Sequence, residues 1–336
     1  MISTIYIENA VSEHPRTKFI VSKFSGARYV SIDRYGEVFN RRNQSFRVQK
    51  TNPALILAKK YNNFLLKTPE GFGLGGENNY YFSHMFNCIY DCRYCFLQGM
   101  YNSAHFVLFV NYEDFNTEIE NTICEHKGEE ITFFSGYDCD SLALESVTGF
   151  VNHLLPVFKR NPAALLELRT KSIQVKSLLD KRPLNNCVVA FSLMPHLMAS
   201  KLDAKAPSIV RRIETMSLLA QKGWKIGLRV DPLIHGRNWK KHYKEFLEDI
   251  FNKIPKTSIH SVSFGPLRFP KKMFKKVLRM HSKEPIYAGP FKDENGFISY
   301  STEVESEMTE FCREISTKFI ADKKIFHCLP TGERYI

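Results

Sequence analysis

Six strand–helix units follow one another between residues 79 and 282, and this rhythm limits the folds open to the chain. The apolar runs of the units are NYYFSHMF, EEITFFSGYD, ALLELRTK, NCVVAFSLMP, KIGLRVDPLI and SIHSVSFGPLRF. Strands that alternate with helices form a parallel sheet joined by right-handed crossovers. The sequence therefore predicts an α/β fold, either a partial (β/α)6 barrel of the TIM type or a doubly wound sheet.

Helical patterns cover most of the segments between these runs. We expect helices over residues 142–159, 207–222 and 239–253, and a further helix in PKKMFKKVLRMHS. Gly223 follows the second of these patterns, at the position where glycine commonly caps a helix. In both candidate folds, chemistry gathers at the carboxyl ends of the strands.

The segments on either side of this series have their own patterns. TIYIE, SEHPRTKFIVSKF and RYVSID read as strand, helix and strand, so residues 1–78 are expected to form a small N-terminal α/β extension. Residues 283–336 are expected to form a cap: a hairpin with an Asn-Gly turn at Asn295–Gly296, a helix over residues 303–319 and the strand KKIFHCL. The predicted parts are thus residues 1–78, 79–282 and 283–336.

The charge of the chain points to a polyanionic partner. Its 336 residues carry a formal net charge of +12. Nucleic acid is the first partner expected and an anionic membrane surface the second, although an ordinary basic enzyme has the same charge. The N-terminal sequence lacks the pattern of a signal peptide, and no apolar stretch is long enough to span a bilayer. We therefore expect a cytoplasmic protein with no membrane partner.

Eight cysteines in a reducing compartment are not a disulfide framework. Five of them are widely scattered and are expected to be small buried side chains: Cys124, Cys139, Cys187, Cys312 and Cys328. The other three, Cys88, Cys92 and Cys95, lie within eight residues in FNCIYDCRYCFLQG. Only this cluster has the spacing of metal ligands.

Three interpretations of the cluster compete. A structural zinc site needs a fourth ligand at fixed spacing, and residues 111–140 offer only Cys124, Cys139 and His126 without such a pairing. Chance clustering in a core is disfavoured by Asp91 and Arg93, which indicate a loop. The third is a 4Fe–4S cluster held by three thiolates, with one iron left free, since catalytic metal sites keep an open position.

The spacing Cys-x3-Cys-x2-Cys, with an aromatic residue before the last cysteine, resembles the signature of the radical S-adenosylmethionine superfamily. The resemblance implies a partial barrel, a 4Fe–4S cluster on Cys88, Cys92 and Cys95, and S-adenosylmethionine bound at the free iron and cleaved to a 5′-deoxyadenosyl radical. The ordered stretches CRYCFLQ, VLFVNYEDF, LRTKSIQVKSLLD, VVAFSLMP, GWKIGLRVDPLIHGRNWKKHYKEFLEDI and LRFPKKMFKKVL resemble the spore photoproduct lyase family. That resemblance implies a carbon–carbon lyase that repairs a thymine dimer in DNA.

The family resemblance also assigns expected roles to single residues. Lys171 would bind the carboxylate of S-adenosylmethionine and Ser192 its amino group. Tyr94 matches a family tyrosine that passes a hydrogen atom near the cofactor. Without the resemblance, the lysine would be a solvated residue at a helix start and the serine a satisfied core hydroxyl.

Two positions depart from the family pattern. Phe96 stands where the family has a second tyrosine, and phenylalanine has no O–H group to donate. An ungapped alignment places Tyr137 at the position of the hydrogen-donating cysteine, with Cys139 two residues further on. The step that returns a hydrogen atom is therefore left open between Tyr137 and Cys139.

Basic segments add to the expectation of a DNA partner. RFPKKMFKKVLRMHSK places several lysines on one helix face, and RYGEVFNRRNQSFR interleaves arginines with aromatic residues. The hairpin at Gly296 resembles in position a lyase element that wedges into damaged DNA, and a lesion must be flipped out to be reached. Flavodoxin or ferredoxin is the electron donor expected. The alternatives are a radical enzyme acting on protein, RNA or a small molecule, and a non-enzymatic zinc protein that binds nucleic acid.

Overall fold

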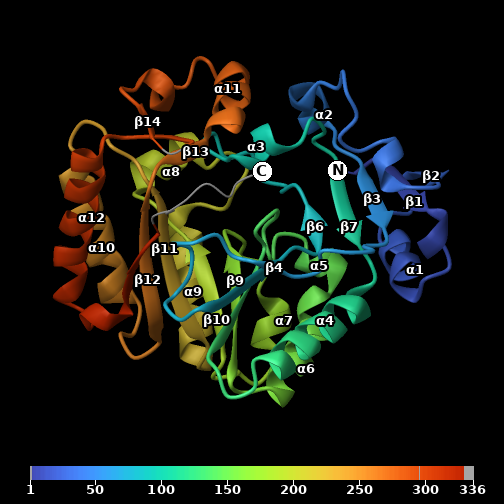
Figure 1. Cartoon of the computed structure of the whole chain (residues 1–336), viewed down its shortest axis with the longest axis horizontal. Coiled ribbons are helices and arrows are strands. Elements are labelled where there is room, and N and C mark those ends of the chain that lie inside the picture. The colour runs from blue at the N-terminus through green and yellow to red at the C-terminus, as the bar shows by residue number, and fades with distance from the viewer. Residues whose placement is uncertain (1, 295, 329–336) are drawn as a thin grey trace.

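The computed structural model describes residues 2–294 and 296–328, and the largest sheet in it has eight strands (Figure 1). Six strands lie side by side in chain order, and each is parallel to the next: β5 (Asn78–Phe82), β8 (Ile131–Ser135), β9 (Ala164–Thr170), β10 (Cys187–Ser192), β11 (Lys225–Leu233) and β12 (Ile259–Pro266). The short strand β4 (Leu66–Lys67) adds antiparallel to β5, and β16 (Ile325–His327) adds parallel to β12.

The unbroken order of the strands decides between the two predicted architectures. A doubly wound sheet reverses its strand order at a switch point, whereas a barrel adds strands in one direction. The order β5-β8-β9-β10-β11-β12 runs one way throughout, and the prediction of a partial TIM-type barrel is confirmed.

Helices pack around this sheet. They are α4 (Tyr112–Glu125), α5 (Glu145–Thr148), α6 (Phe150–Arg160), α7 (Lys176–Leu179), α8 (His196–Leu202), α9 (Ile209–Lys222) and α10 (Trp239–Lys253). Figure 1 shows α4 and α6 along one flank of the sheet and α10 along the other. The prediction of one continuous helix over residues 142–159 was wrong. Gly149 adopts a left-handed conformation with φ 58°, and the segment is divided there into α5 and α6.

Helix α9 shows how the local sequence sets the ends of an element. Its N-cap is Ser208, whose hydroxyl accepts a hydrogen bond from the backbone N–H of Arg211. Gly223 ends the helix in the left-handed conformation predicted for a C-cap, with φ 103°. Between these caps, Ile213, Met216 and other apolar residues recur on one buried face, which packs toward β11.

A second sheet lies in the N-terminal half of the chain. Its strand order is β2-β1-β3-β7-β6, built from β1 (Thr4–Glu8), β2 (Arg28–Ile32), β3 (Leu55–Ala58), β6 (Met85–Phe86) and β7 (Phe106–Phe109). Strands β1, β2, β3 and β7 are parallel, and β6 is antiparallel to β7. The helices α1 (Pro15–Ser22), α2 (Phe46–Thr51) and α3 (Leu97–Met100) accompany this sheet. The cysteine loop leaves from β6, so it starts in this sheet and not in the barrel.

The third sheet belongs to the C-terminal cap. Its order is β13-β15-β14, with β13 (Arg268–Pro270), β14 (Lys292–Glu294) and β15 (Phe297–Ser299) all antiparallel. The predicted hairpin is therefore present, although Asn295 of its predicted turn lies outside the described residues. Helix α11 (Lys271–Met280) precedes it and α12 (Thr302–Thr317) follows it.

The three sheets do not follow the predicted division of the chain one to one. Strand β4 belongs to the barrel sheet although it precedes residue 79, and β16 belongs to the same sheet although it follows residue 282. The division at those residues stays a prediction. Among the helices of the described residues, none is long and apolar enough to cross a membrane.

Candidate active site

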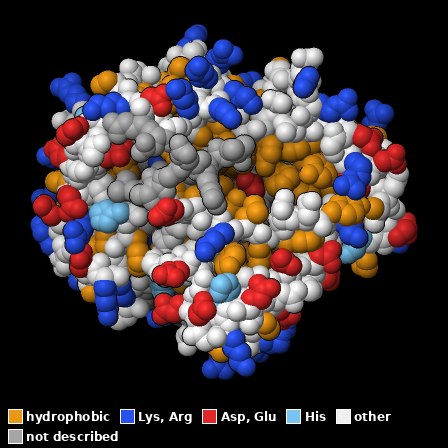
Figure 2. All heavy atoms as spheres, viewed as in Figure 1, with side chains coloured by type: hydrophobic (Ala, Val, Ile, Leu, Met, Phe, Trp, Pro, Cys, Tyr) orange, Lys and Arg blue, Asp and Glu red, His pale blue; other side chains and the backbone are white. Residues whose placement is uncertain are grey.

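A cavity of about 260 Å³ opens at the carboxyl-terminal ends of the barrel strands. Its wall includes the last residues of three neighbouring strands: Ser135 of β8, Thr170 of β9 and Ser192 of β10. Figure 2 shows a hollow near the middle of the molecule, with hydrophobic side chains at its edge. In barrels of parallel strands this end carries the chemistry, so the cavity is the candidate active site.

All the residues that the sequence assigned to the site line this cavity. They are Cys88, Cys92, Tyr94, Cys95, Phe96, Tyr137, Cys139, Lys171 and Ser192. They come from the cysteine loop, the loop after β8, and the ends of β9 and β10. Their roles stay predictions, but their meeting at one cavity is a property of the fold.

Hydrogen bonds from outside the cysteine loop hold its backbone in place. The N–H groups of Asp91 and Arg93 donate to the carbonyls of Ala204 and Leu202, both at 2.8 Å. The Asp91 carboxylate pairs with Arg47 at 2.8 Å and with Arg93 at 3.2 Å. The loop between β6 and α3 is thereby tied to the segment after α8 and to α2.

The buried lysine Lys50 reaches this loop from α2. Its ammonium donates a hydrogen bond to the carbonyl of Cys88, and the side chain is 4% exposed. Burial lowers the pKa of Lys50, while the nearby Cys88 and Asp91 act in the opposite direction. The Lys50 amine is therefore held beside the thiols of the loop by its hydrogen bond to the Cys88 carbonyl.

Burial also governs the three thiols. It raises the pKa of Cys88 to about 12, with a further contribution from Asp140, and raises those of Cys92 and Cys95. Backbone N–H groups of Tyr90 and Leu97 donate to the sulfur atoms of Cys88 and Cys95 and oppose this rise. Without a metal the thiols are protonated, and a positively charged metal group would convert them to thiolates.

The donor set of the loop fits an iron–sulfur cluster. Among residues 2–294 and 296–328, no group of three or more His, Cys, Asp or Glu side chains stands ready to hold a single metal ion. Ligands of one zinc ion converge on a point, whereas ligands of a four-iron cluster each bind a separate iron. Three thiols on one loop, two of which accept N–H bonds at sulfur, would supply one ligand to each of three irons and leave a fourth iron without a protein ligand.

Lys171 lies beside Tyr94 and close to two of the thiols. Its ammonium stands 5.5 Å from the centroid of the Tyr94 ring. Burial opposes the charge of Lys171, but Cys92 and Asp203 outweigh it and raise the Lys171 pKa. A protonated lysine in the cavity wall is an anchor for a carboxylate.

An ion pair behind the wall fixes Tyr94. The Tyr94 hydroxyl donates to the Asp203 carboxylate, which pairs with Arg212 at 2.8 Å. Burial opposes ionisation of Asp203, but Lys171 and Arg212 hold the pKa of Asp203 below its usual range. Neither Asp203 nor Arg212 was singled out from the sequence, and the salt bridge joins the residue after α8 to α9, so no local pattern marked it.

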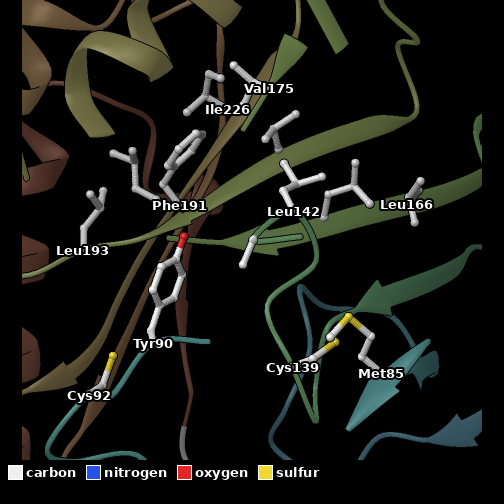
Figure 3. Close-up of a cluster of buried hydrophobic side chains, with 14 of the residues drawn as sticks. Met85, Tyr90, Cys92, Cys139, Leu142, Leu166, Val175, Phe191, Leu193 and Ile226 are labelled. Atoms are coloured by element: carbon white, nitrogen blue, oxygen red, sulfur yellow. The ribbon is translucent and has the colours of Figure 1, made fainter. Parts of the chain in front are cut away.

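The two candidate hydrogen donors occupy different settings. The Tyr137 ring lies between Tyr81, at 4.3 Å between centroids, and Phe96, at 5.9 Å. Cys139 is 8% exposed, its sulfur accepts a hydrogen bond from the Met85 N–H, and burial raises the pKa of its thiol well above the usual value. Figure 3 shows the Cys139 and Met85 side chains turned toward each other. Both candidate donors line the cavity.

Asp140 is a polar residue of the site that the sequence analysis did not name. Its carboxylate accepts hydrogen bonds from the Thr170 hydroxyl and the Lys171 N–H, both at 2.6 Å. Burial raises the Asp140 pKa. The aspartate joins the loop after β8 to the end of β9 and so positions Lys171. Its place two residues beyond Asp138, at the end of an apolar run, was the only sequence signal.

Cys328 at the opposite wall was also missed. The scattered cysteines were expected to be small buried side chains, but Cys124 is exposed, while Cys139 and Cys328 are buried and line the cavity. The Arg268 guanidinium donates to the Cys328 sulfur at 3.1 Å and also pairs with Asp231 at 3.3 Å. Burial raises the Cys328 pKa, and Arg268 opposes the rise. Strand β16 brings this thiol to the site only through its pairing with β12.

Solved structures with the same fold are known. Spore photoproduct lyase complexed with dinucleoside spore photoproduct has a TM-score of 0.85 at 18% identity, over 98% of this chain and 99% of that chain. A mutant of spore photoproduct lyase with bound AdoMet and dinucleoside spore photoproduct gives the same values. The similarity shows that the fold is shared over nearly the whole chain.

Sequence comparisons give the family. Spore photoproduct lyases from Clostridium acetobutylicum and Geobacillus sp. (strain Y412MC61) are 26% and 21% identical over 178 residues. These alignments cover 52% and 53% of this chain, and they span about half the length of the two curated relatives, 53% and 52%. The family model described as spore photoproduct lyase matches residues 76–285, more than half of the chain. The chain therefore belongs to the spore photoproduct lyase family.

Proposed function

We propose that this protein is a radical S-adenosylmethionine enzyme that repairs a DNA base lesion of the thymine dimer type, as a carbon–carbon lyase. One observation carries the proposal: Cys88, Cys92 and Cys95 line the same cavity as Lys171 and Ser192. Family membership supports it, since solved lyases of this fold bind AdoMet and dinucleoside spore photoproduct.

The residues of the cavity would divide the work of cofactor binding. A 4Fe–4S cluster with S-adenosylmethionine, when bound, supplies a 5′-deoxyadenosyl radical that abstracts a hydrogen atom from the substrate. Cys88, Cys92 and Cys95 would hold the cluster. The Lys171 ammonium would donate to the carboxylate of S-adenosylmethionine, and the Ser192 hydroxyl would accept from its ammonium group.

Tyr94 would position the cofactor from the side of the cysteine loop. Its hydroxyl proton is held at Asp203, and its ring lies beside Lys171. The apolar rings around the cavity, Phe96 and Tyr137 among them, would keep water from a reactive carbon radical.

We propose that either Tyr137 or Cys139 returns a hydrogen atom to the product. The O–H or S–H bond breaks, one hydrogen atom moves to the carbon radical, and the unpaired electron stays on oxygen or sulfur. Phe96 contacts Tyr137 and has no hydrogen of this kind to give. The chain would thus replace the tyrosine pair expected for the family with a different donor arrangement.

The nucleic acid would dock over α11 and the hairpin β14–β15. Helix α11 exposes Lys271, Lys272, Lys275, Lys276 and Arg279, and Lys271 pairs with Asp293 of the hairpin. Figure 2 shows Lys and Arg side chains gathered above the hollow, over the α11 region. Such a cationic rim attracts phosphates and would guide a flipped lesion to the cavity. Flavodoxin or ferredoxin would supply the electron that the cofactor requires.

Anaerobic reconstitution tests this function. Reduced protein with S-adenosylmethionine is incubated with irradiated and with unirradiated DNA, and 5′-deoxyadenosine and remaining lesion are measured. We expect 4Fe–4S absorption and more 5′-deoxyadenosine and lesion loss with irradiated DNA. Absence of both the absorption and 5′-deoxyadenosine would overturn the enzyme class. 5′-Deoxyadenosine that does not respond to DNA would favour another substrate, and zinc without iron would favour the non-enzymatic alternative.

Salt-dependent binding tests the nucleic-acid partner separately. Replacing one phosphate-contacting lysine reduces the slope of log affinity against log salt by about one. We expect this for Lys275→Gln on α11. Lys222→Gln, at the C-terminal end of α9, is a matched exposed control and should leave the slope unchanged. Equal slopes for both variants would remove α11 from the interface.

A further inference from the structure

A second cavity, of about 400 Å³, lies in the N-terminal half of the chain. We call it the aromatic pocket. Its wall is made by the rings of Tyr35, Phe39, Phe86 and Tyr101, together with Arg34, Gly36 and Asn40. The proposed reaction uses none of these residues, and most of them come from the segment RYGEVFNRRNQSFR, which the fold alone leaves unexplained.

The rings of the pocket form one continuous aromatic surface. The Phe39 centroid lies 5.0 Å from that of Tyr101 and 6.1 Å from that of Phe86, with the latter pair stacked. Tyr35 meets Phe86 edge to face at 6.3 Å. Phe39 is buried, but the other three rings are only partly buried and keep free surface. A surface of this kind accepts another flat ring by stacking.

A positive charge lies at the rim of this surface. Arg34 is exposed, and its guanidinium stacks on the Tyr61 ring at 4.1 Å, which holds the charge at the rim. Arg41 and Arg42 follow in the same segment and are also exposed. An apolar stacking surface with a cationic rim is complementary to a base attached to a phosphate backbone.

The aromatic pocket lies next to the candidate active site. Phe86 of the pocket precedes Cys88 of the candidate active site by two residues, and Tyr101 of the pocket ends α3, whose first residue Leu97 lines that site. Figure 2 shows hydrophobic side chains continuing from the hollow toward the region of α3 and β7.

We propose that the aromatic pocket binds an undamaged nucleobase of the same nucleic-acid strand whose lesion occupies the candidate active site. The base stacks on the exposed surface of Tyr35 and Tyr101, and Arg34 contacts the adjacent phosphate. This inference rests on the proposed nucleic-acid partner. It adds a second point at which the strand is held, and it makes affinity depend on a base beside the lesion.

A larger side chain at Gly36 can fill the pocket without removing any existing contact. A Cβ atom on Gly36 would have no neighbour within 4 Å, and the backbone there is not left-handed. Gly36→Leu should therefore fold and occupy the pocket. Gly26 is likewise exposed, with no neighbour within 4 Å of an added Cβ, and lies away from the pocket, so Gly26→Leu is the matched control.

The probe is a short single-stranded oligodeoxynucleotide with one 2-aminopurine, whose fluorescence falls when the base stacks on an aromatic ring. We expect quenching with the full-length protein and with Gly26→Leu. With Gly36→Leu we expect the quenching to be lost and the affinity to fall about tenfold. An oligonucleotide with an abasic residue at the probe position should bind wild type and Gly36→Leu equally, because only its phosphates are held.

A second pair of variants guards against misfolding of the first. Tyr35→Leu removes a ring and should weaken quenching, whereas Tyr35→Phe keeps the ring and should retain it. Quenching and affinity unchanged in both Gly36→Leu and Tyr35→Leu would overturn the inference, as would an equal loss in Gly26→Leu. If the wild-type protein binds the probe in a salt-dependent manner but the pocket variants do so equally well, only the pocket is refuted. If the wild type does not bind at all, the proposed nucleic-acid partner fails with it.

Discussion

The hydroxyl of Tyr94 donates a hydrogen bond to the carboxylate of Asp203, and this bond joins the cysteine loop to the segment after α8. Asp203 is in turn paired with Arg212, whose guanidinium donates at 2.9 Å to the carbonyl of Ser192 at the end of β10. Asp203 and Arg212 are 2% and 0% exposed at the side chain. One buried ion pair therefore holds together three parts of the candidate site.

Removing the charge of Asp203 should destabilise the fold. Asp203→Asn leaves the buried Arg212 without its counter-ion, and breaking such a pair costs about 3 kcal/mol. Tyr94→Phe removes only one hydrogen bond to the same carboxylate and should cost about 1 kcal/mol. Urea unfolding of both variants measures the free energies of unfolding. Equal losses would show that the ion pair does not anchor the segment.

Each cysteine of the loop should be needed for iron. We expect Cys88→Ala, Cys92→Ala and Cys95→Ala to lose most of the iron and sulfide after anaerobic reconstitution, because a cluster with two protein thiolates is weakly held. Cys124→Ala is the control, since that thiol is exposed and distant from the cavity wall. Metal analysis and the visible absorption spectrum measure how much iron and cluster each variant holds. Iron retained by the loop variants at the level of the control would contradict the assignment.

The hydrogen donor can be identified by separating cofactor cleavage from repair. Tyr137→Phe and Cys139→Ala both leave Cys88, Cys92, Cys95, Lys171 and Ser192 in place, so both should still form 5′-deoxyadenosine with irradiated DNA. The variant that lacks the true donor should consume more cofactor for each lesion repaired, because the product radical is then quenched less often within the site. If neither variant changes this ratio, the donor is a different residue, and Cys328 is the remaining thiol of the described cavity wall.

Lys50 should raise the reduction potential of the bound cluster. A buried positive charge next to the thiolates stabilises the reduced, more negative state, and charge is one of the main influences on such potentials. Lys50→Met should shift the midpoint potential to more negative values, while Lys50→Arg should keep it near that of the wild type. A potentiometric titration followed by electron paramagnetic resonance measures the shift. Identical potentials for Lys50→Met and the wild type would refute the role of the charge.

Asp138 should make the fold less stable as the pH rises. Burial raises the pKa of this carboxyl to about 6, against 3.8 in its usual state, although Ser83 and Lys60 oppose the rise. Between those two values the folded protein binds more protons than the unfolded chain, so stability falls with increasing pH. The free energy of unfolding is about 2 to 3 kcal/mol lower above pH 6 than it would be with an unshifted pKa.

Asp138→Asn tests this pH dependence because asparagine is uncharged at every pH and has nearly the same shape. The difference in free energy of unfolding between the variant and the wild type should grow in favour of the variant from pH 4 to pH 6 and then level off. Urea unfolding at several pH values gives this difference. A difference that does not vary with pH would show that Asp138 is not buried as a neutral acid.

Local patterns predicted much of the fold. The strand–helix rhythm predicted the parallel sheet, and the helical pattern over residues 207–222 with Gly223 after it marked α9 to within two residues. Patterns of this kind depend on contacts between near neighbours in the chain. The break of α5 from α6 at Gly149 was not predicted, since a glycine inside a helical pattern is often tolerated.

The pairing of segments that are distant in the chain was harder to predict from the sequence. The run HFVLFV forms strand β7 of the N-terminal sheet, and its apolar pattern alone does not show which sheet it joins. The candidate site shows the same difference between local patterns, which the sequence reveals, and distant contacts, which it does not. The loop cysteines were recognised by their spacing, whereas Asp203, Arg212 and Cys328 entered the site only through contacts with residues far away in the chain.

The sequence by itself determined the kind of chemistry: three closely spaced thiols, a lysine and a serine at the ends of strands, and a phenylalanine where a family tyrosine is expected. The spacing of residues within a loop or strand is a local property, so it can be read directly. The tertiary structure alone decided which side chains surround these groups, including the ion pair behind Tyr94, the buried Lys50 and the aromatic pocket. Those contacts depend on how segments that are distant in the chain pack against one another. Burial and neighbouring charges in the folded protein then shift the pKa of each group away from the value set by its residue type.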